Sequence, residues 1–288
     1  MYYAIIADVH ANLEALEAVL KDIKKRKIES ILFLGDAVGY GPNPNECIEV
    51  LQEIVSESTR TEKVSLMGNH DSAVIGLTDL EYFNPNARTA IEWTKDILTE
   101  KNKAFLKNLP LFKSLRGALA TKQSYNNIKN KEIATPRIIG ARNDKTGLPH
   151  SPQSKGFLDI FLVHATPKEP EQWHYLLTKQ DAYINFHFFT EKICLIGHSH
   201  QPSIIEQLPE GEMVIYKDNA EIKDKHRYII NVGSVGQPRD GNPDAAYALL
   251  NEDSIEIKRV SYDILSTQKK MRGAGLPSFL IERLARGR

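Results

Sequence analysis

Short apolar runs alternate with amphipathic stretches along the first quarter of the chain. Residues 2–7 are almost wholly apolar and end on polar residues, which predicts a buried strand. Residues 12–26 carry apolar side chains at helical spacing and begin at Asn12, a residue type that suits an N-cap. The alternation continues with a strand at 31–34, a helix at 45–55 and a strand at 64–67. This order is typical of an α/β protein with parallel neighbouring strands.

The remaining chain gives a mixed pattern of strands and helices. We expect one or two helices over 84–108 and a helix over 180–189. From about residue 263 the pattern predicts two short helices, divided at 275–277 where Gly and Pro occur. Strands are predicted at 111–115, 156–163, 193–196, 228–231, 245–250 and 254–260, the last two as a hairpin.

Composition and charge narrow the class of protein. The 288 residues allow one large domain or two small ones, and 37 basic residues balance 37 acidic ones. Zero net charge argues against a nucleic-acid or membrane coat, and no apolar run reaches the length of a membrane span. The start of the chain does not read as a signal peptide. Cys47 and Cys194 are too few for a disulfide framework or a zinc finger and fit a reducing cytoplasm.

Five short polar motifs follow directly on predicted strands. In an open α/β sheet, ligands bind outside the carboxyl ends of the strands, so these motifs are expected to converge on one place. The motifs are Asp8-Val9-His10, Gly35-Asp36, Gly68-Asn69-His70-Asp71, His164 and Gly197-His198-Ser199-His200. Each motif alone is weak, since a single histidine at a strand end is more often structural. The ordered set of five is highly specific.

The chemistry of this set favours a pair of metal ions. Apart from His70, the motifs hold two Asp, one Asn and four His, a mixed oxygen and imidazole set that suits Mn, Fe or Zn better than Ca or Mg. Seven ligands are too many for one tetrahedral ion and suit two ions sharing one bridging carboxylate. Two ions roughly 3.5–4 Å apart form the clamp used for in-line attack at phosphorus.

The ordered motifs resemble those of the calcineurin-like metallophosphoesterases, most closely the small bacterial and archaeal branch. Residues 35–44, 231–241 and 274–284 also resemble that branch, and the resemblance covers nearly the whole chain apart from 117–156. It implies a single domain over 1–288. It also implies a four-layer α/β/β/α sandwich, in which two mixed sheets are flanked by helices.

The resemblance further implies roles for the motif residues. A hydroxide bridging the two ions would be the nucleophile, and His70 would donate to the phosphate oxygens or the leaving group without binding metal. Asp36 would bridge the two ions. One ion would be held by Asp8, His10, Asp36 and His200, and the other by Asp36, Asn69, His164 and His198.

Four more residues are candidates whose roles stay open. Asp71 could orient His70 or could act as the N-cap of a helix. Arg239 lies in a turn rich in Pro and Gly, where it could fork onto a phosphate or pair with a neighbouring aspartate. Tyr40 and Asn43 lie on a Gly- and Pro-rich loop that forms a pocket wall or caps the next helix.

The stretch at 117–156 differs from the rest of the chain. Between residues 120 and 156 there are seven basic and two acidic residues, a local charge of +5, which favours a solvated surface insertion. The insertion precedes a strand that His164 follows, and seven residues of strand span about 23 Å. The point at which the insertion joins the sheet, its root, should therefore lie away from the metals. A contact between Arg137 or Arg142 and substrate would contradict this. The insertion could serve self-association as a homo-oligomer.

Departures from related subfamilies shape the expected function. The Ser/Thr protein phosphatases and the symmetrically cleaving diadenosine tetraphosphatases carry an Asp and an Arg where this chain has residues 37–40, Ala-Val-Gly-Tyr. We expect a cytoplasmic metal-dependent phosphodiesterase, with some phosphomonoesterase activity, for a small, nucleotide-like substrate. The alternative is a dinucleoside polyphosphate hydrolase; a nuclease or a binding scaffold resembling the retromer subunit is less favoured. Substrate recognition is expected from loops near 40–45, 72–90, 165–175 and 234–243.

Overall fold

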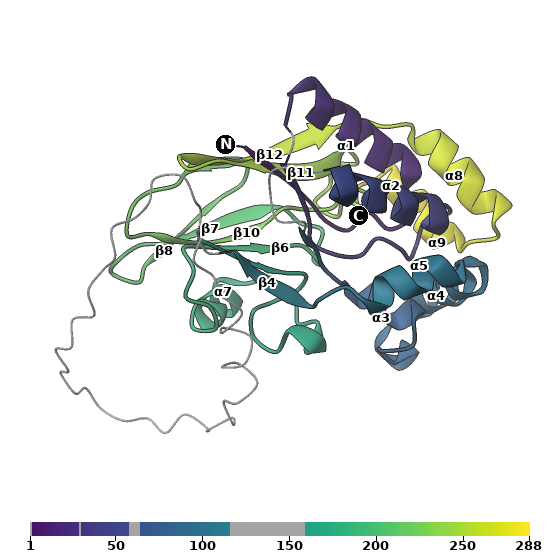
Figure 1. Ribbon diagram of the computed structural model, residues 1–288, viewed down its shortest axis with the longest axis horizontal. Coiled ribbons are helices and arrows are strands. Elements are labelled where there is room, and N and C mark those ends of the chain that lie inside the picture. Colours follow the sequence, from purple (N-terminus) through teal and green to yellow (C-terminus); the bar gives the residue numbers. More distant parts are fainter. Residues whose placement is uncertain (1, 29, 58–63, 116–158) are drawn as a thin grey trace.

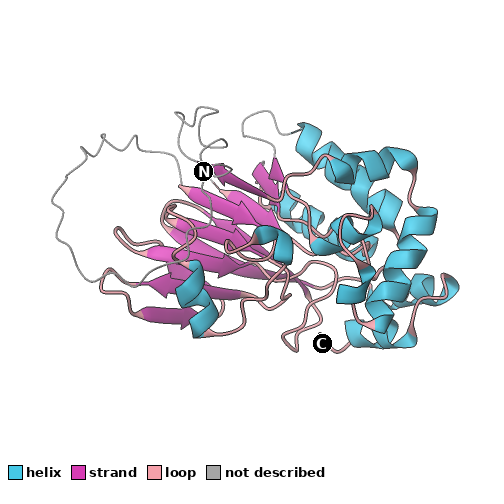
Figure 2. Cartoon of the chain, turned by 90° about the horizontal axis from the view of Figure 1, so that it is seen from below, coloured by secondary structure: helices cyan, strands magenta, loops and turns pink. Residues whose placement is uncertain are grey.

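Two six-stranded mixed sheets pack against each other in the computed structural model, and helices lie outside them (Figures 1 and 2). The structure describes residues 2–28, 30–57, 64–115 and 159–288. The four-layer sandwich expected from the sequence is confirmed. Figure 2 shows most helices gathered at one end of the two sheets. Within the described ranges, no helix is long and apolar enough to cross a lipid bilayer.

The first sheet has the strand order β3-β2-β1-β11-β12-β9. β1, β2 and β3 are parallel, as the strand–helix alternation predicts, while β11 runs antiparallel to β1. Its strands are β1 (Tyr3–Ile6), β2 (Ser30–Phe33), β3 (Val64–Ser65), β9 (Asn219–Glu221), β11 (Ala245–Leu250) and β12 (Ser254–Val260).

The second sheet has the order β4-β5-β6-β10-β7-β8. Its central strands β5, β6 and β10 are parallel, and the outer strands run antiparallel to their neighbours. Its strands are β4 (Phe112–Leu115), β5 (Ile160–Val163), β6 (Ile193–Ile196), β7 (Ser203–Gln207), β8 (Met213–Tyr216) and β10 (Arg227–Asn231).

Burial on both faces explains why the central strands are continuously apolar. In β1, Ile5 packs between the sheets with Leu195 of β6, whereas Ala4 and Ile6 pack on the opposite face beneath the helices. A strand covered on both faces needs apolar residues at every position rather than at alternate ones. Both sheets therefore present the carboxyl ends of parallel strands as rigid platforms for the polar residues that follow.

Helices cover the two outer faces unequally. α1 (Leu13–Lys25) and α2 (Pro44–Glu57) lie over the first sheet, and α8 (Ile264–Gly273) packs against α1, whereas α7 (Lys179–Asn185) packs on the second sheet (Figure 1). The side chain of Asn12 accepts a hydrogen bond from the N–H of Ala15 at 3.2 Å, which confirms Asn12 as the N-cap of α1. The remaining helices are α3 (Asn69–Val74), α4 (Pro85–Ile97), α5 (Glu100–Lys107) and α9 (Ser278–Leu284), with 3-10 turns η1 (Leu80–Tyr82) and η2 (Pro170–Gln172).

The predicted helices and strands are found within a few residues of their expected bounds, and α4 and α5 divide the region 84–108. The sequence did not predict α3, β7, β8 or β9. The insertion at 117–156 lies wholly outside the described residues, as do residues 156–158 of the strand predicted at 156–163, so the prediction about the insertion's root lies outside them too. Leu115 and Ile160, which precede and follow this region, pair at the end of β5 away from His164.

Candidate metal centre

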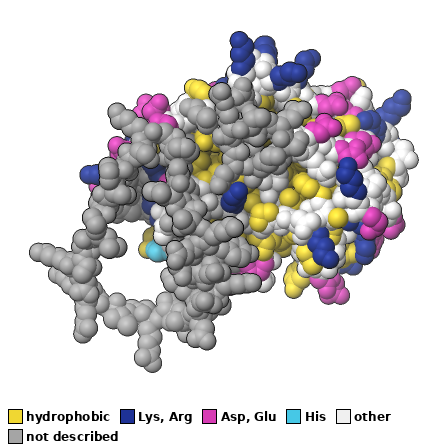
Figure 3. All heavy atoms as spheres, viewed as in Figure 1, with side chains coloured by type: hydrophobic (Ala, Val, Ile, Leu, Met, Phe, Trp, Pro, Cys, Tyr) yellow, Lys and Arg dark blue, Asp and Glu magenta, His cyan; other side chains and the backbone are white. Residues whose placement is uncertain are grey.

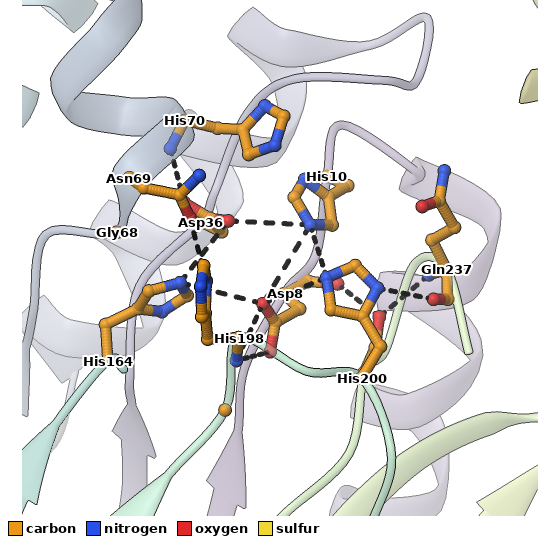
Figure 4. Close-up of polar contacts among 12 residues, drawn as sticks. Asp8, His10, Asp36, Gly68, Asn69, His70, His164, His198, His200 and Gln237 are labelled. Atoms are coloured by element: carbon orange, nitrogen blue, oxygen red, sulfur yellow. Dashed lines mark hydrogen bonds and ion pairs between the residues drawn. The ribbon is translucent and has the colours of Figure 1, made fainter. Parts of the chain in front are cut away.

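The carboxyl ends of five strands bring all the motif residues into one buried cluster (Figure 4). The two carboxylates lie in the middle, with His164 and His198 on one side and His10 and His200 on the other. The residues are Asp8 and His10 after β1, Asp36 after β2, Asn69 and His70 after β3, His164 after β5, and His198 and His200 after β6.

Carboxylate and imidazole atoms face one another across short distances. Asp36 Oδ2 lies 3.4 Å from His164 Nε2 and 3.5 Å from His10 Nε2. Asp8 Oδ1 lies 3.3 Å from His200 Nε2. Three overlapping groups each place their ligand atoms within 4.8 Å of one another, which is close enough to share a cation: Asp8-His10-His200, His10-Asp36-His70 and Asp8-Asp36-His164.

Backbone carbonyls fix the orientation of three imidazole rings. A carbonyl oxygen can only accept, so each Nδ1 must carry a proton; each Nε2 points into the cluster, where the neutral ring offers a lone pair. This arrangement is the one that prepares a histidine for metal binding. The pairs are His10 with Val38 at 3.0 Å, His164 with Leu34 at 3.0 Å, and His200 with Gln237 at 2.6 Å.

Backbone strain is concentrated at the same residues. Left-handed backbone at a residue other than Gly is costly and persists where the surrounding structure enforces it, often at functional sites. Here the enforcing contacts include a 3.0 Å hydrogen bond from the N–H of His198 to Asp8 Oδ2. The strained residues and their φ angles are Asp8 (53°), His10 (48°), Asp36 (59°), His198 (64°) and His200 (59°).

Two glycines allow the backbone to approach the carboxylates. A Cβ on Gly68 would lie 2.0 Å from Asp36 Oδ1, and a Cβ on Gly197 would lie 2.5 Å from Asp8 Oδ2. Any larger residue would therefore displace a carboxylate of the cluster. This accounts for the glycine that precedes each of these motifs.

Asp71 is not the N-cap of α3, so that interpretation is wrong, and its hydrogen bonds in the described chain reach backbone N–H groups and not the ring of His70. Gly68 is the N-cap of α3, and Asp71 is the third residue of that helix. Its buried carboxylate accepts hydrogen bonds from the N–H groups of Asp36 (2.8 Å), Gly68 (3.1 Å) and Val38 (3.2 Å). Asp71 thus joins the loop after β2 to the start of α3.

The two central carboxylates differ in their electrostatic environments. Burial raises the pKa of Asp8 to about 7, although His164 partly offsets this effect. Burial alone would also raise the pKa of Asp36, but His164, His70 and His10 outweigh burial and hold it well below its usual range. In turn, the carboxylate of Asp36 overcomes the burial of His164 and raises the pKa of that imidazole to about 9.

Several ring nitrogens of the cluster face one another in positions where a bound cation would satisfy them better than their present neighbours do. His10 Nε2 and His200 Nε2 lie 3.0 Å apart, and burial holds the pKa of both imidazoles well below its usual value. Two neutral rings whose Nδ1 atoms are protonated would direct their lone pairs at each other. His198 Nε2 is buried without a hydrogen-bond partner among the described residues, and His164 Nε2 lies against carboxylate oxygens of Asp36 and Asp8. A shared cation would satisfy these atoms.

Comparison with known proteins agrees with this geometry. The family model described as calcineurin-like phosphoesterase matches residues 1–202. The chain belongs to the calcineurin-like phosphoesterases. It is therefore a phosphoester hydrolase of a family that uses a dinuclear divalent metal site, and the resemblance drawn from its motifs is confirmed.

The matches between this phosphoesterase and its relatives cover nearly the full length of the chain. It is 37% identical over 287 residues to an uncharacterised protein of Methanocaldococcus jannaschii, MJ0912, covering 99% of this chain and 98% of the relative. The crystal structure of a metallophosphoesterase from Sphaerobacter thermophilus is 33% identical, with a TM-score of 0.73 and full coverage of both chains. Protein PH1004 from Pyrococcus horikoshii has a TM-score of 0.70 at 19% identity, covering 100% of this chain and 98% of that one, which shows the fold alone.

Two of the three candidate substrate-binding residues lie beside the cluster. The Tyr40 ring centroid lies 4.3 Å from that of His70 and 5.5 Å from the guanidinium carbon of Arg239. Arg239 donates to Gln237 Oε1 at 2.7 Å and makes no ion pair with a neighbouring aspartate in the described chain, because Arg259 pairs with Asp240 instead.

The side chain of Asn43 bonds to residues of two helices and to none of the motif residues in the described chain. Its side chain donates to Glu46 at 3.1 Å and accepts from Lys270 of α8 at 3.2 Å, while its carbonyl accepts the N–H of Cys47. These contacts favour the interpretation in which this part of the loop caps the following helix α2. The side chain of Asn43 therefore connects α2 to α8.

Sequence reasoning missed the aromatic residues that border the cluster. Tyr175 stacks on His198 with ring centroids 4.2 Å apart, and Trp173 lies with its ring 6.0 Å from that of His164. The only signal in the sequence was that 165–175 follows a predicted ligand, since stacking partners far apart in the chain leave no local pattern. His174 is not a ligand in this arrangement and pairs with Glu169 at the surface.

Proposed function

We propose that this phosphoester hydrolase is a two-metal phosphodiesterase that acts on a small, nucleotide-like substrate. The observation that carries the proposal is the pair of buried carboxylates lying between imidazoles whose Nε2 atoms face inward. When bound, two ions would acidify water for attack at phosphorus and neutralise charge on the phosphoryl oxygens. The mixed oxygen and imidazole donors favour Mn, Fe or Zn. The first ion would be held by Asp8, His10, Asp36 and His200, and the second by Asp36, Asn69, His164 and His198.

His70 is positioned to act on the substrate beside these ligands. Its backbone N–H donates to Asp36 Oδ1 at 2.9 Å, and its side chain packs against Tyr40 and the ring of His10. Burial lowers the pKa of His70 to about 4, so the ring is neutral near pH 7. Its Nδ1 is buried without a hydrogen-bond partner among the described residues. A neutral imidazole in this place can donate one N–H to a phosphoryl or leaving-group oxygen.

Arg239, packed near Tyr40, is placed to bind a phosphate oxygen of the substrate. The backbone N–H of Arg239 donates to the carbonyl of His200, which ties this arginine to the predicted ligand loop. Its guanidinium is half-buried, bonded to Gln237 and packed near the Tyr40 ring. A held guanidinium fits a phosphate oxygen better than a mobile surface arginine does.

Surface charge and cysteine chemistry support a small substrate in a reducing compartment. On the face drawn in Figure 3, Lys and Arg side chains lie among Asp and Glu side chains, as expected for zero net charge. A nucleic-acid surface would concentrate one sign. Cys47 and Cys194 are both free and buried, which supports the expectation of a cytoplasmic protein.

Hydrolysis of bis(p-nitrophenyl) phosphate with added Mn²⁺ tests the proposal. We expect metal-dependent turnover, faster than that of p-nitrophenyl phosphate. Asp36→Asn and His70→Ala should each lower kcat by about 100-fold or more. Asp96→Asn and His187→Ala are matched controls, because both residues are exposed and outside the cluster. Metal-independent turnover, or full activity in Asp36→Asn, would refute the proposal, and cleavage of phosphoanhydrides alone would favour the polyphosphate hydrolase.

A further inference from the structure

A cavity of about 370 Å³ opens directly beside the candidate metal centre. Asn69, His70 and His198 form its inner end. Its two outer walls come from residues 77–84 and from residues 171–175, which follow different ligand motifs. The walls are joined by a hydrogen bond of 3.2 Å from Trp173 Nε1 to Thr78 Oγ1. A substrate held at the ions therefore has room for a second group at this place.

Several aromatic side chains contribute to the walls of the cavity. Tyr40, Phe83 and Trp173 line it together with two rings that are largely open to solvent, Tyr82 (85% exposed) and Tyr175 (50% exposed). Trp173 has left-handed backbone with a φ of 54°, a strained conformation that the surrounding contacts must hold. Exposed aromatic rings grouped at a cavity provide flat surfaces on which another ring can stack.

The Asp, Glu, Lys and Arg side chains of the described chain that line the cavity are all acidic. Asp79 and Glu171 both line it, whereas no Lys or Arg of the described chain does. Asp79 Oδ1 accepts the N–H of Glu81, which leaves its second oxygen for another donor. Carboxylates here repel any further phosphate group, and they accept hydrogen bonds from amino or hydroxyl groups.

We propose that this cavity binds the nucleoside part of a phosphodiester, with the base stacked on Tyr82 and its amino group donating to Asp79 or Glu171. This inference rests on the proposed function, because it names the substrate of the same site. It gives Tyr82 the role of a specificity residue. It also disfavours a polyphosphate chain, whose added negative charges would meet the two carboxylates.

Two diesters with the same leaving group test the proposal in the Mn²⁺-loaded protein. Adenosine 5′-(p-nitrophenyl phosphate) and methyl p-nitrophenyl phosphate differ only in the group offered to the cavity. We expect kcat/KM to be about tenfold or more higher for the adenosine ester. Tyr82→Ala should reduce this ratio about fivefold or more, because a stacking surface is lost. Tyr82 is so exposed that its replacement should not prevent folding.

Tyr183→Ala is the matched control, because Tyr183 is an exposed tyrosine of α7 outside the cavity. It should leave the ratio of the two rates unchanged. The double variant Asp79→Ala and Glu171→Ala should remove the preference for the adenosine ester over the purine riboside ester, whose base has neither the amino group nor another N–H donor. A ratio near one in the wild type, or a ratio that Tyr82→Ala does not change, would overturn the proposal.

Failure of this inference can be distinguished from failure of the proposed function. If the wild type cleaves neither ester with metal, the phosphodiesterase is wrong, and equilibrium dialysis then tests the cavity without turnover. Adenosine 5′-monophosphate should bind more tightly than ribose 5-phosphate, and Tyr82→Ala should remove the difference. Equal binding of the two ligands to the wild type would refute the nucleoside site.

Discussion

The carboxylate of Asp71 accepts a hydrogen bond of 2.8 Å from the backbone N–H of Asp36, which lies 35 residues earlier in the chain. The same carboxylate also accepts from the N–H groups of Val38 and Gly68. One buried side chain therefore holds the loop that carries Asp36, the expected bridging ligand, against the helix that carries His70. Asp71 is a positioning residue, because the atoms it binds belong to the backbone.

Asp71→Asn should destabilise the protein and weaken metal binding together. The amide replaces an acceptor oxygen by an NH₂ group and leaves buried N–H groups unpaired, so we expect the free energy of unfolding to fall by about 2–3 kcal/mol. Metal affinity should fall about 10- to 100-fold. Urea denaturation and Mn²⁺ titration measure the two effects.

Asp263→Asn is the control for Asp71→Asn. Asp263 is the N-cap of α8, and Asn is an equally good capping residue, so stability should change by less than about 0.5 kcal/mol. If Asp71→Asn unfolded at the same urea concentration as the wild type and bound Mn²⁺ equally well, the assigned positioning role would be wrong.

Gly68→Ala should disrupt the candidate metal centre, because the added methyl carbon would lie 2.0 Å from Asp36 Oδ1. We expect a loss of roughly 1–3 kcal/mol in stability and weaker metal binding, since the carboxylate must move. Gly273→Ala is the matched control. The methyl carbon there would meet no atom within 4 Å, so that variant should equal or slightly exceed the wild type in stability. Normal Mn²⁺ affinity in Gly68→Ala would contradict the close packing at this point.

Acid should destabilise the protein partly through Glu206, a buried residue of β7. Burial would raise the pKa of Glu206, but hydrogen bonds from Tyr216, Lys223 and Tyr228 outweigh it and lower the pKa. A carboxyl group with a lowered pKa in the folded state adds stability above its unfolded pKa, about 4.3. That stability is lost as the pH falls through the folded pKa.

The unfolding free energy of Glu206→Gln should therefore depend less on pH below about pH 5 than that of the wild type. Near pH 7 the variant should be less stable by roughly 1–3 kcal/mol. Glu210→Gln, a change at an exposed residue between β7 and β8, should follow the wild type throughout. Chemical denaturation at several pH values checks this, and parallel curves for Glu206→Gln and the wild type would exclude the contribution.

Much of the fold was predictable because central strands are marked by continuous apolar runs, as in β1 and β6. The strands that escaped prediction lack that mark. β7 contains Glu206, whose charge is satisfied by residues distant in sequence, and β9 has a single buried residue, Ala220. In α3 every residue is buried and most are polar, so helical periodicity is absent.

The site was predictable where its residues directly follow strands, because the strand order alone determines that such residues meet. Contacts between distant loops were not. The stacking of Tyr175 on His198 and the hydrogen bond of Asp71 to Asp36 depend on how loops fold back after leaving the sheet. Such contacts have no local sequence pattern, so the roles of Asp71 and Tyr175 emerged only from the structure.

The number of metal ions bound per chain tests the central claim most directly. Equilibrium dialysis against Mn²⁺, followed by elemental analysis, should give two ions per chain for the wild type. Asp36→Asn should bind fewer, because Asp36 lies against His10 of one proposed ligand set and His164 of the other. His70→Ala should retain two, because the two proposed ligand sets do not include His70. A wild-type chain that binds one ion or none, or an Asp36→Asn variant that binds two as tightly, would contradict a two-metal centre bridged by Asp36.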